Sequence, residues 1–233
     1  MTDYNDFKIF KDNIVFSPWI QLPKNDWSIL EPLGNKKFYK RNFIIYNCNE
    51  FSDYVYIVDS GRVELYIVDS EGNKKVIGIC DKGSLFGELQ LFDGKPNYCT
   101  ARICRDAWVF EIQKNVFMDA ILSNNDLMLS NLYNLTTKMR ILYTQVEYLS
   151  FKPAEAKVAL MFISMCKDFG VKLNNNEYKL NITFTHSDIA NMTGLSRVTV
   201  SNTIMNLTNQ GIIRKEGSEY FICDIGYLKK LVG

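Results

Sequence analysis

Residues 185–207, THSDIANMTGLSRVTVSNTIMNL, contain the most informative spacing in the chain. The small residue Ala190 is followed four positions later by Gly194 and ten positions later by Val200. A small residue lets two helices approach closely, and glycine can take the left-handed conformation that ends a helix. A small residue, a turn glycine and a buried aliphatic residue at these offsets are typical of a helix-turn-helix.

The residues around this spacing predict where the two helices begin and end. Thr185 or Ser187 can cap the first helix and Ser196 the second, because their hydroxyl groups accept hydrogen bonds from free backbone amides. We expect Gly211 to end the second helix, and residues 212–223 to form a strand, a turn and a strand, which is the pattern of a wing. The predicted buried face of the second helix consists of Val200, Ile204 and Leu207.

The opposite face of this second helix, predicted over residues 196–210, carries side chains that suit the edges of DNA bases. Arginine can bind two acceptors on a guanine, asparagine can pair with an adenine edge, and valine can contact a thymine methyl group. Serine and threonine hydroxyls suit phosphate oxygens. The alternative is a helical hairpin with a solvated polar face, and the predicted wing argues against it. The candidate DNA-binding residues are Ser196, Arg197, Val198, Thr199, Ser201 and Asn202.

The first half of the chain has a different pattern, in which short runs of mixed apolar and polar residues are separated by turns. Short strands punctuated about every ten residues indicate an antiparallel sandwich, jelly roll or barrel. The expected strands are 54–58, 63–68, 74–80 and 101–112, and the expected turns are 59–61, 69–73 and 81–83.

Between Asn115 and Pro153 the chain lacks glycine and proline, and apolar residues recur at alternating spacings of four and three. A strict heptad repeat is typical of a two-helix coiled-coil seam, whereas the core-facing helix of a monomer usually has a broader, less regular stripe. We therefore predict a seam between two subunits, with a core-facing helix as the alternative. The predicted seam residues are Met128, Leu132, Leu135, Met139, Leu142, Val146 and Leu149.

Composition narrows the class of protein. The chain has 233 residues, of which 47% are hydrophobic and 23% charged, and this favours a folded protein of two domains. The apolar runs are short and the N-terminus is polar, so we expect no membrane segment and a cytoplasmic location. Residues 150–233 hold ten Lys and Arg against seven Asp and Glu, a weak indication of an anionic partner.

The six cysteines contain no Cys-x2-Cys pair, and His186 is the one histidine, so zinc and iron–sulfur sites are not expected. We expect reduced thiols, and a redox-sensing role for Cys99 and Cys104 stays open. No nucleophile–base pair, metal set or phosphate-binding glycine loop is present in the sequence, so we do not expect an enzyme.

Four motifs carry a resemblance to a known family: Asp59-Ser-Gly-Arg-Val63, the run GSLFGELQLF at 83–92, the heptad helix, and GLSRVTVS at 194–201. From about Leu22 to its end, the chain resembles the cyclic-AMP receptor protein and FNR family of bacterial transcription regulators. The resemblance implies an α+β fold. Its parts are a double-stranded β-helix (a jelly roll like that of cyclic-nucleotide-binding domains) over 1–114, a dimerisation helix region over 115–150 and a winged helix-turn-helix over 151–233.

The same resemblance implies partners and an effector. A regulator of this kind is a homodimer that binds double-stranded DNA at a palindromic, A/T-rich operator with half-sites of the TTA type, and it contacts RNA polymerase. A small molecule in the N-terminal domain controls its DNA affinity. The competing class is a cyclic-nucleotide-binding regulatory subunit without DNA function, and the predicted wing argues against that class.

The family's cyclic-AMP contacts are only partly matched. Gly87 and Glu88 match the residues that contact the ribose, but Asn97 and Tyr98 fall where an Arg-Ser pair grips the phosphate. Asparagine cannot supply the charged fork that a phosphate needs, so cyclic AMP is not the expected effector. No cysteine precedes Cys48, and His186 lies outside the sensor domain, so neither an iron–sulfur cluster nor haem is expected as a cofactor.

Residues 97–101 look more like the regulators of halorespiration, which sense chlorinated phenols. The walls of the predicted pocket are aromatic and largely apolar, which suits an aromatic or hydrophobic metabolite. A cyclic-AMP-responsive regulator and a filled barrel without effector remain the alternatives. Arg102 can pair with a ligand anion or form a structural ion pair. The candidate effector residues are Phe86, Gly87, Glu88, Leu89, Asn97, Tyr98, Arg102, Leu142 and Tyr143.

Overall fold

The computed structural model describes residues 27–173 and 177–232. Contacts within the chain divide it into two units between Leu142 and Tyr143, inside one long helix. Among the described residues, no helix is both long enough and apolar enough to cross a membrane.

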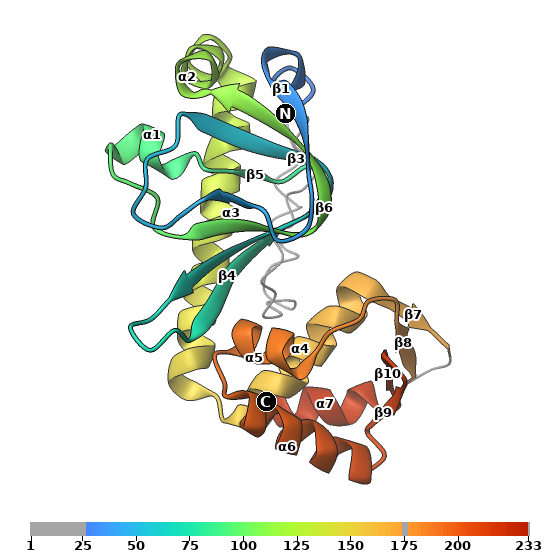
Figure 1. Ribbon diagram of the computed structural model, residues 1–233. Helices are drawn as coiled ribbons and strands as arrows, with labels where there is room; N and C mark the ends of the chain where they lie inside the picture. The colour runs from blue at the N-terminus through green and yellow to red at the C-terminus, as the bar shows by residue number, and fades with distance from the viewer. Residues whose placement is uncertain (1–26, 174–176, 233) are drawn as a thin grey trace. The chain divides into compact units, whose positions relative to one another are not determined.

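The N-terminal unit is an antiparallel β-roll followed by helices (Figure 1). Strands β3 and β6 pair along most of their length, β1 and β2 pair with β6, and β4 and β5 pair with β3. Side chains such as Val63, Phe86 and Ile103 fill the core of the roll. The elements are η2 (Glu31–Leu33), β1 (Asn35–Tyr39), β2 (Ile44–Tyr46), β3 (Tyr54–Val68), β4 (Lys74–Cys80), β5 (Leu85–Phe86), α1 (Leu89–Asp93), β6 (Thr100–Gln113), α2 (Lys114–Ser123) and α3 (Asn125–Phe151).

The expected turn at 59–61 was wrong, because β3 runs without a break from Tyr54 to Val68. Its pairing with β6 shifts register around Ser60 and Arg62, so these residues form bulges that bend one strand. Gly61 has a φ of +88°, and a Cβ atom there would lie 2.1 Å from the Asp106 carbonyl oxygen. Glycine is therefore required at 61 by the close approach of β6 rather than by a turn.

The helix region predicted over 115–150 consists of two helices, α2 and α3. Asn124 has an extended conformation (φ −139°, ψ 107°), which ends α2. Its side-chain oxygen accepts hydrogen bonds from the backbone amides of Asp126 (3.0 Å) and Leu127 (3.2 Å), so it also caps the start of α3. All seven heptad positions lie in α3, which ends at Phe151, two residues before Pro153.

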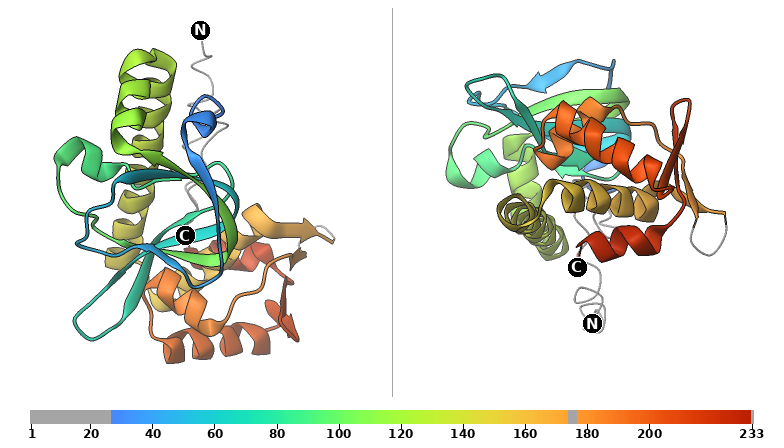
Figure 2. Two further views of the ribbon diagram at one scale, coloured as in Figure 1. Left: turned by 45° about the horizontal axis from the view of Figure 1, so that its top comes forward. Right: turned by 90° about the horizontal axis from the view of Figure 1, so that it is seen from below.

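The C-terminal unit is a winged helix-turn-helix, as predicted. Helix α4 packs against α5, α6 and α7 (Figure 2). Phe162 of α4 meets Tyr220 of β10 edge to face, with ring centroids 5.3 Å apart. Helix α7 was not predicted. The elements are α4 (Ala154–Phe169), β7 (Gly170–Lys172), β8 (Tyr178–Leu180), α5 (His186–Thr193), α6 (Arg197–Asn209), β9 (Ile213–Glu216), β10 (Glu219–Ile222) and α7 (Ile225–Val232), and the sheet order is β7-β8-β10-β9.

Candidate functional site

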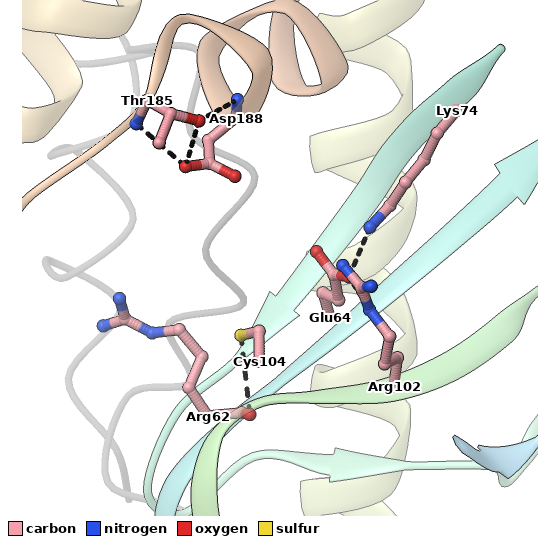
Figure 3. A network of polar contacts seen from close by, with 7 residues as sticks. All are labelled: Arg62, Glu64, Lys74, Arg102, Cys104, Thr185 and Asp188. Atoms are coloured by element: carbon pink, nitrogen blue, oxygen red, sulfur yellow. Dashed lines mark hydrogen bonds and ion pairs between the residues drawn. The ribbon is translucent and has the colours of Figure 1, made fainter. Parts of the chain in front are cut away.

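Both helices of the helix-turn-helix begin at the predicted capping positions. Thr185 caps α5: its hydroxyl accepts the Asp188 amide (3.1 Å), and the Asp188 carboxylate accepts the Thr185 amide (2.9 Å), which forms a capping box (Figure 3). Gly194 ends α5 in the left-handed conformation with a φ of +69°. Ser196 caps α6 by accepting the Thr199 amide (3.0 Å). Local chemistry therefore fixes the start of α5 at Thr185 and both sides of the turn between the two helices, at Gly194 and Ser196.

Helix α6 buries the aliphatic face that the sequence predicted, namely Val200, Ile204 and Leu207. On its other side Arg197, Val198 and Asn202 are exposed, and Ser201 is half-buried. The Ser196 and Thr199 hydroxyls lie 2.8 Å apart and are hydrogen-bonded to each other at the start of the helix. The exposed face thus presents one cation, one amide and one apolar group together, with two hydroxyls at the helix N-terminus, where backbone amides favour anions.

The wing carries a cationic side chain near His186, Lys215, which was not assigned from the sequence. Lys215 of β9 and Arg197 of α6 both lie close enough to His186 to lower the pKa of its imidazole, although burial is the larger cause. Arg214, the neighbouring cation, forms ion pairs with Glu177 and Glu216. The signal in the sequence was the Arg214-Lys215 pair in the predicted wing, but only the fold shows which of the two lies near α6.

In the N-terminal unit, the candidate residue Glu88 is fully buried and already paired. Its Oε1 accepts hydrogen bonds from the Lys138 ammonium (2.6 Å) and the Asn134 amide (3.3 Å), and Lys138 also donates to the Leu85 carbonyl (2.8 Å). A buried carboxylate is stable only when it is paired and hydrogen-bonded, and α3 supplies both partners.

Three buried oxygens around this ion pair lack a hydrogen-bond partner among the described residues: Glu88 Oε2, Asn131 Oδ1 and Asn134 Oδ1. Asn131, Asn134 and Lys138 follow one another on the inner side of α3 and were not assigned from the sequence. Their spacing of three and four residues could have identified them, because residues at this spacing lie on one side of a helix. They form a polar stripe beside the heptad positions. The site is therefore more polar than the predicted apolar pocket.

The other predicted effector residues fall in different environments. Phe86 lies in the core, stacked on Tyr56 with centroids 5.1 Å apart, and Gly87 follows it at the end of β5. Asn97 is buried, and its side-chain amide donates to the Glu50 carbonyl (3.0 Å). The exposed ones are Leu89, Tyr98, Leu142 and Tyr143, with Tyr98 the most exposed at 75%.

Arg102 forms a structural ion pair. Its guanidinium donates to Glu64 (2.6 Å), and the same carboxylate also holds the Lys74 ammonium; both cations point toward Glu64 in Figure 3. Lys74 also lies 4.2 Å from the ring centroid of Tyr66. Of the two roles considered for Arg102, the structure displays the ion pair.

The heptad stripe of α3 is solvent-exposed in the single chain. Met128 and Leu135 are half-buried, and the other five positions are between 42% and 61% exposed. An exposed apolar stripe of this length is unusual for a surface helix, whose apolar side normally faces the core.

Two protein families match the chain, one over each unit. The cyclic nucleotide-binding domain family matches residues 36–124, and the Crp-like helix-turn-helix domain family matches residues 156–231. The predicted α+β fold class and the order of its parts are confirmed.

Relatives span most of the chain. The Anaerobic regulatory protein of Bacillus subtilis (strain 168) is 23% identical over 208 residues, which cover 85% of this chain and 87% of that protein. The cAMP-activated global transcriptional regulator CRP of Salmonella typhimurium is 24% identical over 169 residues, 72% of this chain and 80% of that one. A CooA mutant from Carboxydothermus hydrogenoformans shares the fold with a TM-score of 0.77 at 20% identity, covering 92% of this chain and 99% of that one.

Proposed function

Because the chain belongs to the CRP/FNR family of transcription regulators, we propose that it is a homodimer that binds an inverted-repeat DNA operator through α6. A small molecule in the β-roll controls the affinity of this binding. The observation that carries the proposal is the exposed face of α6, where Arg197, Val198 and Asn202 lie together on a helix capped by Ser196. The regulator acts in the cytoplasm, together with RNA polymerase.

The α6 face supports a specific mode of readout. Arg197 reads a guanine through two acceptors, Asn202 reads an adenine edge, and Val198 contacts a thymine methyl group. Ser196 and Thr199 supply hydroxyls for phosphate oxygens, and such contacts fix the register but carry no sequence information. Ser201 lies on the same face as Arg197, Val198 and Asn202. Because valine accepts no hydrogen bond from cytosine, the half-site is richer in A·T pairs at the position of Val198. The resemblance to the family points further to a half-site of the TTA type.

The dimer rests on the exposed heptad stripe of α3. Seven apolar residues in register, five of them more than two-fifths exposed, match the seam of a parallel two-helix coiled coil. A two-fold dimer places its two α6 helices in successive major grooves, roughly 34 Å apart, so the half-sites are centred about one helical turn from each other.

The effector proposed for the β-roll is not cyclic AMP. Asn97 bonds to the Glu50 carbonyl and Tyr98 projects into solvent, so neither offers a cationic grip for a phosphate. The Glu88 carboxylate, which matches the ribose contact, is already bound by Lys138. An aromatic or hydrophobic metabolite remains the favoured effector. A specific observation supports a second candidate, a regulator without effector: the Glu88–Lys138 pair and the Tyr56–Phe86 stack fill part of the roll with the protein's own side chains.

Selection of bound sequences from random double-stranded DNA tests the function. The full chain should enrich an inverted repeat whose two arms lie about one helical turn apart. Asn202→Ala should relax the preference at one base pair of each arm, whereas Lys230→Ala on α7, which removes an exposed cation of the same unit, should select the same repeat as the wild type. Enrichment of a non-palindromic site, or of no site, would overturn the proposal.

A further inference from the structure

Cys48 and Cys99 lie in two neighbouring segments, one that follows β2 and one that precedes β6. Tyr46 of β2 is paired with Ala101 of β6 in antiparallel register. Glu50 lies four residues after Tyr46, and Asn97 lies four residues before Ala101. The backbone amide of Asn97 donates to the Glu50 carbonyl (2.9 Å). Between these two points residues 47–50 form a turn, and the Asn49 backbone amide donates to the Asn97 carbonyl (2.7 Å). Cys48 therefore lies on a turn that is held against the segment carrying Cys99.

The contacts of Cys48 reach both neighbours of Cys99. The Cys48 amide donates to the Thr100 hydroxyl (3.1 Å), and the Cys48 thiol donates to the Tyr98 carbonyl (3.1 Å). These two contacts bracket Cys99. Burial is the main cause of the raised pKa of the Cys99 thiol, and Cys48 is close enough to contribute to it. The two cysteines are therefore near neighbours, as a disulfide requires.

We propose that Cys48 and Cys99 are a redox modification site that closes into an intramolecular disulfide in the sensor unit. The oxidant is a small disulfide such as glutathione disulfide. The Cys48 thiolate attacks one sulfur of the oxidant, forms a mixed disulfide and releases one glutathione thiolate. Cys99 then loses its proton and attacks the Cys48 sulfur, which releases the second glutathione. Two cysteine thiols are oxidised, and one glutathione disulfide is reduced to two thiols.

The surroundings of the two thiols fix the order of attack. Cys99 packs against the core of the roll, and burial raises the pKa of its thiol to about 11. Cys48 lies on a surface turn between Asn47 and Glu50, and both of these residues are exposed. The thiol on the turn therefore meets the oxidant first, and the inner thiol resolves the mixed disulfide.

The other two cysteines of this unit are not suited to the same reaction. Cys80 is fully buried, so an oxidant cannot reach it. The Cys104 thiol lies 3.5 Å from the Arg62 carbonyl (Figure 3), and the residues of β3 that pair around it are Arg62 and Val63. Cys104 is half-buried, as Cys48 is, but no cysteine is among the residues of β3 that pair around it. This makes Cys104 a matched control.

Tryptic mapping of the full chain tests the proposal, because Lys95 is followed by Pro96 and resists cleavage. Cys48 then lies in peptide 42–62 and Cys99 in peptide 83–102, apart from the peptides of Cys80 and Cys104. After incubation with glutathione disulfide and blocking of free thiols, peptides 42–62 and 83–102 should be found joined, lighter than their reduced sum by two hydrogen atoms. Reduction should separate them.

Three variants make the outcome decisive. Cys99→Ser should trap the mixed disulfide, so that peptide 42–62 gains one glutathione. Cys48→Ser should abolish the joined pair and leave Cys99 unmodified, and Cys104→Ser should behave as the wild type. A joined pair in which Cys48 is linked to Cys80 or to a second chain, or free thiols at both 48 and 99 under conditions that oxidise a small dithiol, would overturn the inference.

Discussion

Helices α3 and α6 bury opposite kinds of side chain. Helix α6 buries its aliphatic residues Val200, Ile204 and Leu207 and turns its polar residues outward, as a helix on a soluble domain normally does. Helix α3 does the reverse, because its heptad stripe is exposed while Asn131 and Asn134 are fully buried. The polar inner stripe has a reason in the fold, since Glu88 needs the ammonium of Lys138 and an amide donor.

The difference indicates what each helix is for. A helix with its apolar side buried is complete within its own unit, and its exposed polar face is available for a polar partner. A helix with its apolar side exposed is incomplete in the single chain, and a self-complementary heptad is best satisfied by a second copy of the same helix. The predictions below change one face of one helix at a time.

The outer face of α3 should give the largest effect. Replacing Leu135 and Leu142 by Asp places two unpaired carboxylates per chain on the seam, each costing several kcal/mol if the seam is buried. We expect monomers in sedimentation velocity and loss of operator binding. Leu122→Asp is the control, because Leu122 is an exposed leucine of α2 outside the stripe. A double variant that sediments as a dimer would refute the seam.

The inner face of α3 should give the next largest effect. Lys138→Met leaves the buried Glu88 carboxylate without its counter-ion, and breaking a buried ion pair in this way costs about 3–5 kcal/mol. Urea unfolding followed by tryptophan fluorescence should show this loss as a lower free energy of unfolding. The double variant Lys138→Met, Glu88→Gln should recover much of it, since the amide needs no counter-ion. Equal stability of the single variant and the wild type would contradict a paired Glu88.

The outer face of α6 should affect DNA affinity and not folding. Arg197→Ala should lower affinity for the selected operator by about 1–3 kcal/mol and relax the preference at one base pair of each half-site. Thr199→Ala should weaken binding to all sequences alike, because a phosphate contact carries no sequence information. Equal losses of Arg197→Ala on operator and random DNA would mean that another element reads the bases.

The contrast between the two helices also shows what the sequence could predict. The α6 unit was predictable because its determinants are local: the offsets among Ala190, Gly194 and Val200, and the cap at Ser196, act over a few residues. The outer stripe of α3 was predictable from its period for the same reason. The inner stripe was not, because Lys138 meets Glu88, 50 positions away in the chain, and only the fold brings them together.

The wrong turn at 59–61 and the unforeseen boundary between α2 and α3 have similar causes. Asp59-Ser-Gly61 has the composition of a turn, but the demand for glycine at 61 comes from the nearby backbone of β6, which composition cannot reveal. The break between α2 and α3 occurs at Asn124 without proline or glycine, through side-chain hydrogen bonds to the amides of Asp126 and Leu127. The residues of the effector site were chosen by resemblance, and four of the nine are exposed in the single chain.

The smallest effect concerns the edge of the α6 surface. The pKa of His186 lies below its ordinary value of 6.5, mainly through burial and further through Lys215 and Arg197. Lys215→Met should therefore raise this pKa while leaving it below 6.5, because burial remains. His186 is the one histidine of the chain, so a single imidazole signal in an NMR titration reports the change without overlap.

The lowered pKa of His186 also makes the stability of the fold depend on pH. A histidine with a lowered pKa in the folded state takes up its proton more readily when unfolded, so the fold loses stability as the pH falls through 6.5 toward the lowered pKa. Lys215→Met brings the folded-state pKa of His186 closer to 6.5 and so narrows the pH range over which stability is lost. The variant should therefore lose less stability on acidification than the wild type. Lys229→Met, which removes an exposed cation on α7, should leave the His186 titration where it was. If both variants shift it equally, the cause is the net charge of the unit and not the proximity of Lys215 to His186.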